Sequence, residues 1–438
     1  MITKRSEAYQ NALDYVFKFI DYSRTHQENI AAENFHLERM HQFLAILEDP
    51  HKKYKTIHVA GTKGKGSVSA LCAGALQAQG YKVGLYTSPH LHEFTERIQI
   101  DRIPVSQPDF AKLVNQIKSA VDQVPQLTSY EIQTALAFLH FAQEKVDIAV
   151  IEVGLGGRLD STNVVSPLVS VITSLSLDHT FILGNTLAEI AGEKGGIIKE
   201  NTPVVTAPQE KEASDMLKQI AKEKNANYTE ISKDIQFQVE DQDLEGQTIS
   251  VGGEISLRST LLGPHQAENM ALAYLALDRA RERGLTISNA SITKGFSEVK
   301  WPGRFEIVQK DPYLIFDGAH NQHSAKMLVK TLIEYFPDIP VSLVFGASED
   351  KDIDGMFQEL LPYVQVFIPV KSTHPRAANP KTLAQKAEKY SPKILKSESI
   401  DQAFDLALTS AEGNGLILVT GSLYLVGEAR FSWFTRVK

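Results

Sequence analysis

A glycine-rich loop between an apolar run and a helical segment restricts the fold of this chain more than any other feature. Residues 56–60 form a short β-branched run that is typical of a buried strand. The loop follows at once, and residues 67–79 then have helical spacing until Gly80 ends the segment. The loop consists of Gly61, Thr62, Lys63, Gly64, Lys65, Gly66 and Ser67. This order of strand, loop and helix predicts an α/β fold with a mainly parallel sheet.

The loop carries the residue types that hold a phosphate group. Backbone N–H groups at a helix start attract anions, and glycines leave room for the phosphate. Lys65 is favoured over Lys63 as the phosphate lysine because it follows Gly64 at the helix entry, and the Ser67 hydroxyl could ligate Mg²⁺. The match to G-x-x-x-x-G-K-[ST] is imperfect. Gly66 separates Lys65 from Ser67, and Gly61 precedes Gly64 by three residues instead of five. A glycine turn with a purely structural role stays open as the alternative.

The rest of the chain alternates strand-like and helix-like segments and predicts two domains. Residues 6–47 are expected to be helical, and residues 236–262 to form a small antiparallel appendage before a helix over 265–283. Further strands are expected at 82–86, 148–153, 168–173, 314–317, 341–345, 364–368 and 416–420, and further helices at 324–335 and 403–409. The Pro-Gly pair at 302–303 breaks helix and strand alike. The predicted divisions are a nucleotide-binding domain over 1–298, a linker over 299–304, and a smaller Rossmann-like α/β domain over 305–438.

Composition excludes several classes of protein. With 43% hydrophobic and 22% charged residues, the 438-residue chain is neither disordered nor fibrous. Its formal net charge of −8 argues against non-specific nucleic-acid binding. The single cysteine, Cys72, excludes an intramolecular disulfide and a cysteine-ligated zinc site, and we expect it to be a packed thiol. The sequence shows neither a signal-peptide core nor an apolar run of membrane-spanning length, so we expect a cytoplasmic protein without membrane or nucleic-acid partners.

Acidic residues and histidines come at the ends of predicted strands. Glu152 ends one strand, and Asp178 and His179 follow the next. In the second domain, Asp317 and His320 lie where a strand meets a helix. Ligands of parallel α/β sheets bind at the carboxyl ends of strands, so Glu152 beside the phosphate loop is favoured as a metal ligand, and the strand-end acids of the two domains predict a substrate site in the cleft between them. By itself, His179 is more simply explained as a structural histidine.

Other polar residues give no functional signal by themselves. Lys194 lies in a helical segment, where most lysines are solvated. Four early histidines have no ligand spacing and are expected on the surface; they are His26, His36, His41 and His51.

Nine motifs in order along the chain resemble those of the folylpolyglutamate synthase and dihydrofolate synthase family, a branch of the Mur ligase superfamily. They lie at residues 57–67, 87–91, 152–163, 177–179, 193–199, 262–269, 302–304, 317–321 and 421–424. The resemblance implies an ATP-dependent ligase that phosphorylates a folate or dihydropteroate carboxylate. The amine of L-glutamate then attacks this acyl phosphate, and ADP and phosphate are released. Domain closure would keep water away from the acyl phosphate.

The resemblance also implies roles for individual residues. Magnesium would be held by Ser67, Ser88, Glu152 and His179. ATP would be bound by the loop residues 61–67 and by Asn269, Arg304 and Asp317. Catalytic roles would belong to Lys65, Lys194, His320 and Ser422, with Lys194 carbamylated. The folate or pteroate would lie near Pro89, Arg158, Leu159 and Asp160. ATP is a substrate and Mg²⁺ a cofactor in this family, a role for K⁺ is left open, and a monomer is expected.

Three positions depart from the family pattern. Lys63 stands where the family usually has Asn, Gly195 where it has Ala, and Gln322 where it has Pro.

Two other functions are weighed against this one. A muramyl-peptide ligase would use the same chemistry, but the N-terminal region is too short for a uridine-nucleotide domain. A nucleotide-dependent switch is disfavoured, because no Asn-Lys-x-Asp guanine motif occurs. The sequence does not distinguish dihydrofolate synthase from folylpolyglutamate synthase or from an enzyme with both activities.

Overall fold

The chain divides into two compact units in the computed structural model, which describes residues 5–20, 36–253, 255–411 and 415–436. The first unit comprises Met1–Glu240, Thr248–Ser259 and Glu268–Val299. The second comprises Lys300–Lys438 together with two short earlier segments, Asp241–Gln247 and Thr260–Ala267. Along the chain, the final boundary between the two units lies between Val299 and Lys300. The domains predicted from the sequence were continuous, so the two short segments of the second unit were not predicted.

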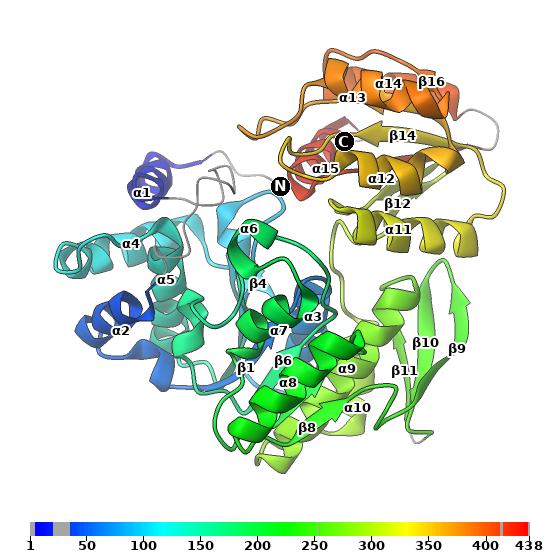
Figure 1. The fold of residues 1–438 in the computed structure, drawn as a ribbon. Helices are drawn as coiled ribbons and strands as arrows, with labels where there is room; N and C mark the ends of the chain where they lie inside the picture. Colours follow the sequence, from blue (N-terminus) through cyan, green and yellow to red (C-terminus); the bar gives the residue numbers. More distant parts are fainter. Residues whose placement is uncertain (1–4, 21–35, 254, 412–414, 437–438) are drawn as a thin grey trace. The chain divides into compact units, whose positions relative to one another are not determined.

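An eight-stranded sheet forms the centre of the first unit, in the order β4-β3-β2-β5-β1-β6-β7-β8 (Figure 1). Its strands are β1 (Lys55–Ala60), β2 (Val83–Tyr86), β3 (Ile98–Ile100), β4 (Ile103–Pro104), β5 (Ile148–Glu152), β6 (Val169–Ile172), β7 (Val204–Thr206) and β8 (Tyr228–Glu230). All pairs from β2 to β8 are parallel, and β3 and β4 add antiparallel pairs at one edge. The α/β class and the mainly parallel sheet are therefore confirmed. In the register, Val59 of β1 faces Glu152 of β5, so the carboxyl ends of these strands meet at one edge of the sheet.

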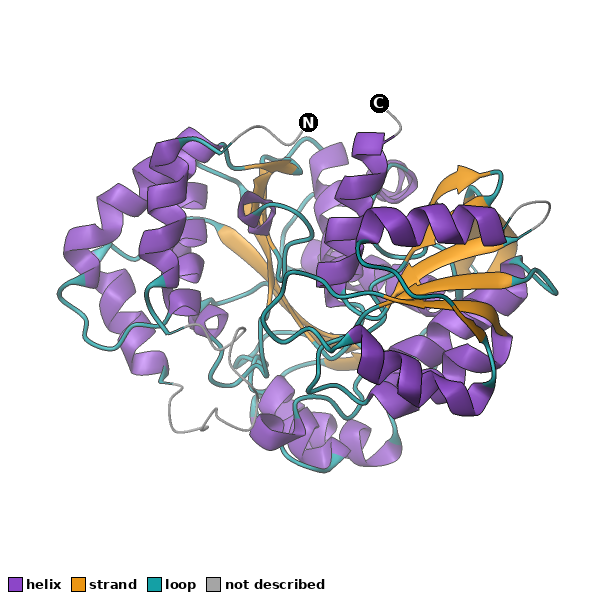
Figure 2. Ribbon diagram, turned by 90° about the horizontal axis from the view of Figure 1, so that it is seen from above, coloured by secondary structure: helices purple, strands orange, loops and turns teal. Residues whose placement is uncertain are grey.

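Helices cover both faces of this sheet (Figure 2). They are α1 (Glu7–Phe17), α2 (Leu37–Ile46), α3 (Lys65–Ala78), α4 (Gln107–Val121), α5 (Ser129–Gln143), α6 (Thr180–Leu183), α7 (Leu187–Gly195), α8 (Lys211–Glu223), α9 (Pro264–Glu282) and α10 (Asn289–Ser297). One core cluster joins α1, α2, α4 and α5 to β2 and β5, and another joins α7 and α8 to β6 and β7. The helical segment expected over 6–47 is confirmed at α1 and α2 but is wrong at Ile20, which forms a β-bridge with Thr128, and residues 21–35 of this range lie outside the described residues.

A three-stranded sheet, in the order β11-β10-β9, confirms the predicted appendage. It consists of β9 (Phe237–Asp243), β10 (Gly246–Val251) and β11 (Ile255–Ser259). Only residues 244 and 245 connect β9 to β10, and so short a connection joins antiparallel neighbours.

The second unit has a six-stranded sheet in the order β12-β13-β17-β14-β15-β16. Its strands are β12 (Glu306–Lys310), β13 (Tyr313–Phe316), β14 (Val341–Phe345), β15 (Val364–Pro369), β16 (Lys393–Ile394) and β17 (Leu416–Thr420), and its helices are α11 (Gln322–Tyr335), α12 (Ile353–Leu360), α13 (Pro380–Ala387), α14 (Ile400–Ser410) and α15 (Leu423–Arg436). Only β12 is antiparallel to its neighbour. The predicted strands of both units lie within one residue of those observed.

The core of the second unit fills the two faces of this sheet with apolar side chains. Leu343 and Phe345 of β14 pack in one cluster with α11 and α12. On the other face, Phe316 of β13 meets Phe404 of α14, which in turn contacts Trp433 of α15. Among the described residues, no helix has the length and apolarity needed to span a bilayer.

Candidate active site

Two glycines shape the loop between β1 and α3, because neighbouring side chains fill the space that a Cβ atom would need at these positions. Gly64 caps α3 with a φ of 91°, and a Cβ there would lie 2.3 Å from Oδ1 of Asn269. Gly61 has a φ of 146°, and its Cβ would lie 1.8 Å from Oγ1 of Thr173. Only glycine fits these positions, because other residues meet both backbone strain and a steric clash. The loop thus brings the predicted ATP residue Asn269 against Gly64, and α3 begins at Lys65, two residues before the predicted start.

A buried carboxylate at the end of β5 lies beside this loop. Glu152 is 5% exposed, and its Oε1 lies 4.0 Å from Nζ of Lys65. The backbone N–H of Ser88, which follows β2, donates to Oε2 of Glu152 at 3.2 Å. Ser67 is buried in the first turn of α3. The structure therefore brings Lys65, Glu152 and the Ser88 backbone together, as expected for residues that follow neighbouring parallel strands.

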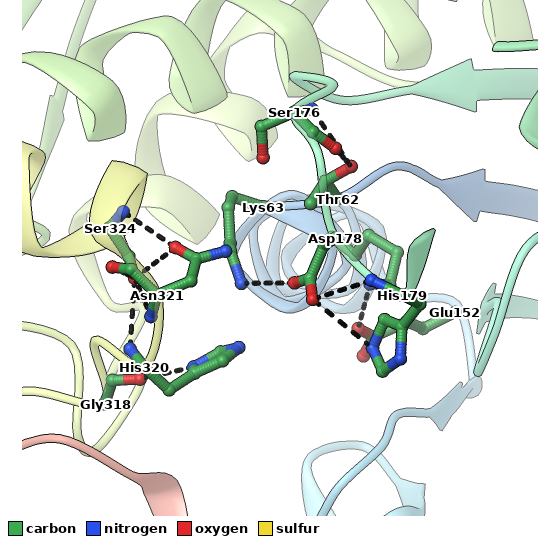
Figure 3. A network of polar contacts seen from close by, with 11 residues as sticks. Thr62, Lys63, Glu152, Ser176, Asp178, His179, Gly318, His320, Asn321 and Ser324 are labelled. Atoms are coloured by element: carbon green, nitrogen blue, oxygen red, sulfur yellow. Dashed lines mark hydrogen bonds and ion pairs between the residues drawn. The ribbon is translucent and has the colours of Figure 1, made fainter. Parts of the chain in front are cut away.

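A second charged pair links the loop to the segment after β6 (Figure 3). Nζ of Lys63 lies 3.1 Å from Oδ2 of Asp178, whose Oδ1 accepts the backbone N–H of His179 at 3.0 Å. Oγ1 of Thr62 donates to the Ser176 carbonyl oxygen at 3.3 Å and accepts the Ser176 N–H at 3.2 Å. The Lys63–Asp178 pair was not predicted from the sequence, since 115 residues separate its members.

Lys194 is buried, so the expectation of a solvated lysine is wrong. It lies in α7, whose start is fixed by a capping box between Thr186 and Glu189. Burial, followed by the nearby charge of Lys65, lowers the pKa of the Lys194 ammonium to about 7. A Cβ at Gly157 would lie 2.8 Å from the Lys194 carbonyl oxygen, so the segment after β5 packs directly on this end of α7. Only the resemblance to a family had singled out this lysine.

The segment after β5 is held by its own buried carboxylate. Asp160 accepts the N–H groups of Gly154 at 3.1 Å, Leu155 at 2.9 Å and Thr162 at 3.0 Å, and the Thr162 hydroxyl at 2.5 Å. Burial raises the pKa of Asp160, while these hydrogen bonds oppose the shift. Nε2 of His58 lies 2.9 Å from the Thr162 hydroxyl, and burial lowers the pKa of His58 to about 3. The Asp160 side chain thus shapes the turn, and sequence reasoning missed His58, which is hidden within an apolar strand.

The other residues predicted to lie near the folate are more open. Arg158 is exposed and forms an ion pair with Glu193 at 2.8 Å. Leu159 is half-buried, and Pro89 is exposed beyond the end of β2.

The early histidines do not behave alike. His36 and His41 are exposed, as predicted, and His26 lies outside the described residues. His51 is 4% exposed and packs beside Phe138, with ring centroids 5.8 Å apart, so its predicted surface position is wrong. Its apolar environment lowers the pKa of His51 to about 4 and keeps the ring neutral.

Cys72 is a packed thiol, as predicted. It is fully buried in α3 beside the Ala273 carbonyl oxygen, and burial raises the pKa of the Cys72 thiol to about 12.

In the second unit, Asp317 follows β13 and binds backbone groups. Its Oδ2 accepts the N–H of Phe305 at 2.9 Å, and its Oδ1 accepts the N–H of Ala319 at 2.8 Å. Burial raises the pKa of Asp317, and the charge of Arg304 opposes that shift. Arg304 and Asp317, both predicted to bind ATP, therefore lie within electrostatic range of each other in one unit.

The loops that start α11 and α15 hold the remaining predicted residues. Nδ1 of His320 lies 2.8 Å from the Gly318 carbonyl oxygen, and the Asn321 side chain caps α11 (Figure 3). Ser422 is buried, and its hydroxyl accepts the N–H of Leu425 at 3.1 Å in the first turn of α15. Both residues thus lie at the carboxyl edge of the second sheet, after β13 and β17 respectively.

Two family profiles match most of the chain. The Mur ligase middle domain matches residues 59–277, and the Mur ligase glutamate ligase domain matches residues 303–423. Dihydrofolate synthase/folylpolyglutamate synthase of Bacillus subtilis is 39% identical to this chain, over 90% of this chain and 94% of the relative.

Solved structures agree with these matches. The folylpolyglutamate synthase of Thermotoga maritima superposes with a TM-score of 0.84 at 36% identity and covers 98% of this chain and 97% of its own. Escherichia coli FolC in complex with DHPP and ADP superposes with a TM-score of 0.85 at 30% identity, over 100% of both chains. The loop, the strand-end acids and these likenesses lead to one conclusion: the chain belongs to the folylpolyglutamate synthase/dihydrofolate synthase family of Mur ligases, and it is an ATP-dependent, ADP-forming glutamate ligase.

Proposed function

We propose that this ligase joins L-glutamate both to dihydropteroate and to reduced folates, through an acyl phosphate formed at the β1–α3 loop. One observation carries the proposal: the loop that starts α3 gathers Lys65, the buried Glu152 carboxylate and the buried Lys194 amine within one electrostatic network. The pairing of both activities in the name of the Bacillus subtilis relative supports the choice of two acceptors.

The reaction has two steps, phosphorylation of the acceptor carboxylate and attack of the glutamate amine on the acyl phosphate. An oxygen of the acceptor carboxylate attacks the γ-phosphorus of ATP, and the bond to the bridging oxygen breaks as ADP leaves with the electron pair. The glutamate amine then attacks the acyl carbon, its proton passes to solvent, and the C–O bond breaks to release phosphate. Lys65 and the N–H groups at the start of α3 would stabilise the negative charge on the transferring phosphoryl group.

The residues at this edge fit a magnesium ion. Mg²⁺ prefers oxygen ligands, takes few from the protein, and completes its shell with water and phosphate oxygens. The buried Glu152 carboxylate supplies one such ligand, and the hydroxyls of Ser67 and Ser88 and the His179 ring would complete the protein's share. Among the described residues, no three His, Cys, Asp or Glu side chains form a metal cage of their own. The ion would offset charge on the β- and γ-phosphates.

Lys194 would serve this site as a carbamate. A carbamate forms when a neutral amine attacks CO₂ and loses a proton, so it needs a lysine whose pKa is low. The pKa of about 7 meets that condition near neutral pH. The resulting anion would place a carboxylate-like group in a region that otherwise buries a cation next to Lys65.

We assign the remaining roles by position. Asn269, Arg304 and Asp317 would bind ATP, His320 and Ser422 would bind glutamate or assist its attack, and Pro89, Arg158, Leu159 and Asp160 would line the folate or pteroate site.

The test is a mass-spectrometric product assay with ATP, Mg²⁺ and L-glutamate. Dihydropteroate is the acceptor in one reaction and tetrahydrofolate in another, and we expect a gain of one glutamyl unit in both. Lys65→Met should reduce turnover by about 10²-fold or more, because the phosphoryl group loses its cation. Lys82→Met is the matched control, since it loses an ion pair with Glu144 at the start of β2, at the opposite edge of the sheet. Phosphate release without a glutamylated product would contradict the proposal.

A further inference from the structure

The phosphate loop is fastened to the segment between β6 and α6 by its backbone. The N–H groups of Thr62 and Lys63 both donate to the Ser174 carbonyl oxygen, at 3.0 and 3.3 Å. The two hydrogen bonds between Thr62 and Ser176 extend this contact by two residues. Gln209 holds the segment from its other side, since its side chain bonds both the Thr173 carbonyl oxygen and the N–H of the residue at 175. Backbone bonds and Gln209 therefore hold the segment up to Ser176, and Asp178 adds a side-chain contact to the loop before α6 begins.

Asp178 forms the last link of this connection, and its two oxygens have different partners. Oδ2 forms an ion pair with the Lys63 ammonium at 3.1 Å, and Oδ1 accepts the backbone N–H of His179 at 3.0 Å. Nε2 of His179 is also 3.8 Å from Oδ1. This carboxylate thus contacts both the backbone and the ring of His179 and helps to orient them (Figure 3).

The backbone of His179 is strained and needs such a restraint. Its φ of 53° lies in the left-handed region, which is unfavourable for a non-glycine residue. Its N–H bond to Asp178 offsets part of this strain, because a charged acceptor makes a stronger hydrogen bond. A change that lets the carboxylate swing away would remove this restraint from the N–H of His179, while its carbonyl oxygen would still accept the N–H groups of Ile182 and Leu183 at 2.9 and 3.0 Å.

The two lysines of the loop are engaged differently. Lys63 and Asp178 form a short, hydrogen-bonded pair, with side chains only 18% and 10% exposed. Lys65 lies 4.0 Å from Glu152, at the limit of an ion pair. Lys65 therefore keeps more freedom to approach a phosphate, whereas Lys63 already neutralises a carboxylate of the protein.

We propose that Lys63 is a positioning residue that acts through Asp178 and sets the orientation of His179, rather than a residue that binds the nucleotide. The proposal rests on the proposed function, in which His179 is a magnesium ligand. It removes Lys63 from the set of ATP contacts expected from the sequence. It also gives a reason for a lysine at this position of the loop, since a side chain of this length reaches across to the segment after β6.

The first experiment measures the restraint itself, without substrates. Hydrogen exchange at the His179 amide should become faster in both Lys63→Met and Asp178→Asn, by about tenfold if the pair contributes energy typical of contacting residues. Lys63→Arg should restore slow exchange, because it keeps the charge. Lys82→Met should not change the His179 amide, because its ion pair lies at the opposite edge of the sheet. Unchanged exchange in Lys63→Met would overturn the proposal.

The second experiment separates metal from nucleotide. In Lys63→Met we expect kcat to fall by about tenfold and the Mg²⁺ concentration for half-maximal rate to rise, while KM for ATP stays within about twofold. Titration of Mn²⁺ into the ADP complex should show weaker metal binding without turnover. The Lys63→Met/Asp178→Asn double variant should be no worse than either single variant, because both remove one interaction.

The outcomes distinguish this proposal from the one on which it rests. A tenfold rise in KM for ATP with unchanged metal binding, additive with Asp178→Asn, would mean that Lys63 contacts the nucleotide and would overturn the inference. If the wild-type chain forms no glutamylated product but the exchange and Mn²⁺ results hold, the proposed reaction is wrong and the role of Lys63 stands.

Discussion

Asp178 and Asp317 both follow a parallel strand and both precede a histidine, yet the two carboxylates have different partners. Asp178 faces the Lys63 ammonium and the N–H of the next residue, whereas both oxygens of Asp317 receive backbone N–H groups. The same sequence signature thus produces an ion pair of two side chains in the first unit and an anchor for the backbone in the second. The difference teaches that a strand-end acid marks an edge of a sheet without fixing its task.

The surroundings of the two carboxylates follow the same division. The first unit gathers several charges at its edge, with Lys65 near Glu152 and Lys194 buried close by. In the second unit, Asp317 and His320 bond to main chain, as His320 does with the Gly318 carbonyl oxygen, while Arg376 and Asp350 form an ion pair of side chains beyond β15 and β14. The first edge thus brings charged side chains close together, whereas the main chain holds Asp317 and His320 in place for the ligand roles proposed for them.

The largest expected effect tests whether the buried charge of the first unit governs its stability. Lys194 has a folded pKa of about 7 against its usual 10.5, so between these values the unfolded chain holds a proton that the folded chain lacks. Unfolding free energy should therefore rise with pH across this window, by about 1.4 kcal/mol per pH unit and roughly 3–5 kcal/mol in all. We expect Lys194→Met to remove this rise, as measured by urea unfolding in CO₂-free buffer at several pH values. Equal slopes in both proteins would show that Lys194 is charged in the folded state.

A smaller effect tests the backbone anchor of the second unit. Asp317→Ala leaves the buried N–H groups of Phe305 and Ala319 without their acceptor, which should lower the free energy of unfolding by about 2–3 kcal/mol. Hydrogen exchange at these two amides should quicken, and added salt should not restore slow exchange. If both amides stay protected in Asp317→Ala, the backbone anchor is wrong, and only the ATP-binding role proposed for this carboxylate would stand.

The smallest expected effect concerns an exposed ion pair of the first unit. Arg158→Gln removes the pair with Glu193, and because Arg158 is exposed the stability should change by less than about 1 kcal/mol and lose its dependence on salt. A rise in KM for the folate acceptor with unchanged KM for ATP would support the substrate role assigned to Arg158. A loss of stability above about 2 kcal/mol would instead place Arg158 among the buried, structural charges.

Local pattern was enough to predict much of the fold and the backbone of the site. The β1–α3 loop, the strand-end residues Glu152 and Asp178, and the class of both sheets follow from neighbours along the chain, where apolar runs and glycines leave a direct signal. The helical segment predicted over 6–47 was right at α1 and α2 and wrong at Ile20, because nothing near Ile20 in the sequence reveals its bridge to Thr128.

Long-range packing explains what the sequence could not predict. Lys194 and His51 are buried by elements that are distant in the sequence. Both are polar residue types, so hydrophobic patterning does not predict their burial. The partnership of Lys63 with Asp178 joins positions 115 residues apart, so no local spacing encodes it. A separation of 104 residues likewise explains why His58, inside an apolar strand, gave no sign of its contact with Thr162.

The lone thiol of Cys72 has a practical consequence for spectroscopy. Because this side chain is fully buried and its pKa is raised to about 12, it remains protonated and shielded from alkylating reagents at neutral pH. A cysteine introduced at any exposed position would then be the single reactive nucleophile of its kind in the 438-residue chain. Fluorescent or spin labels can be attached one at a time to the native background, without first replacing a residue of the α3 core.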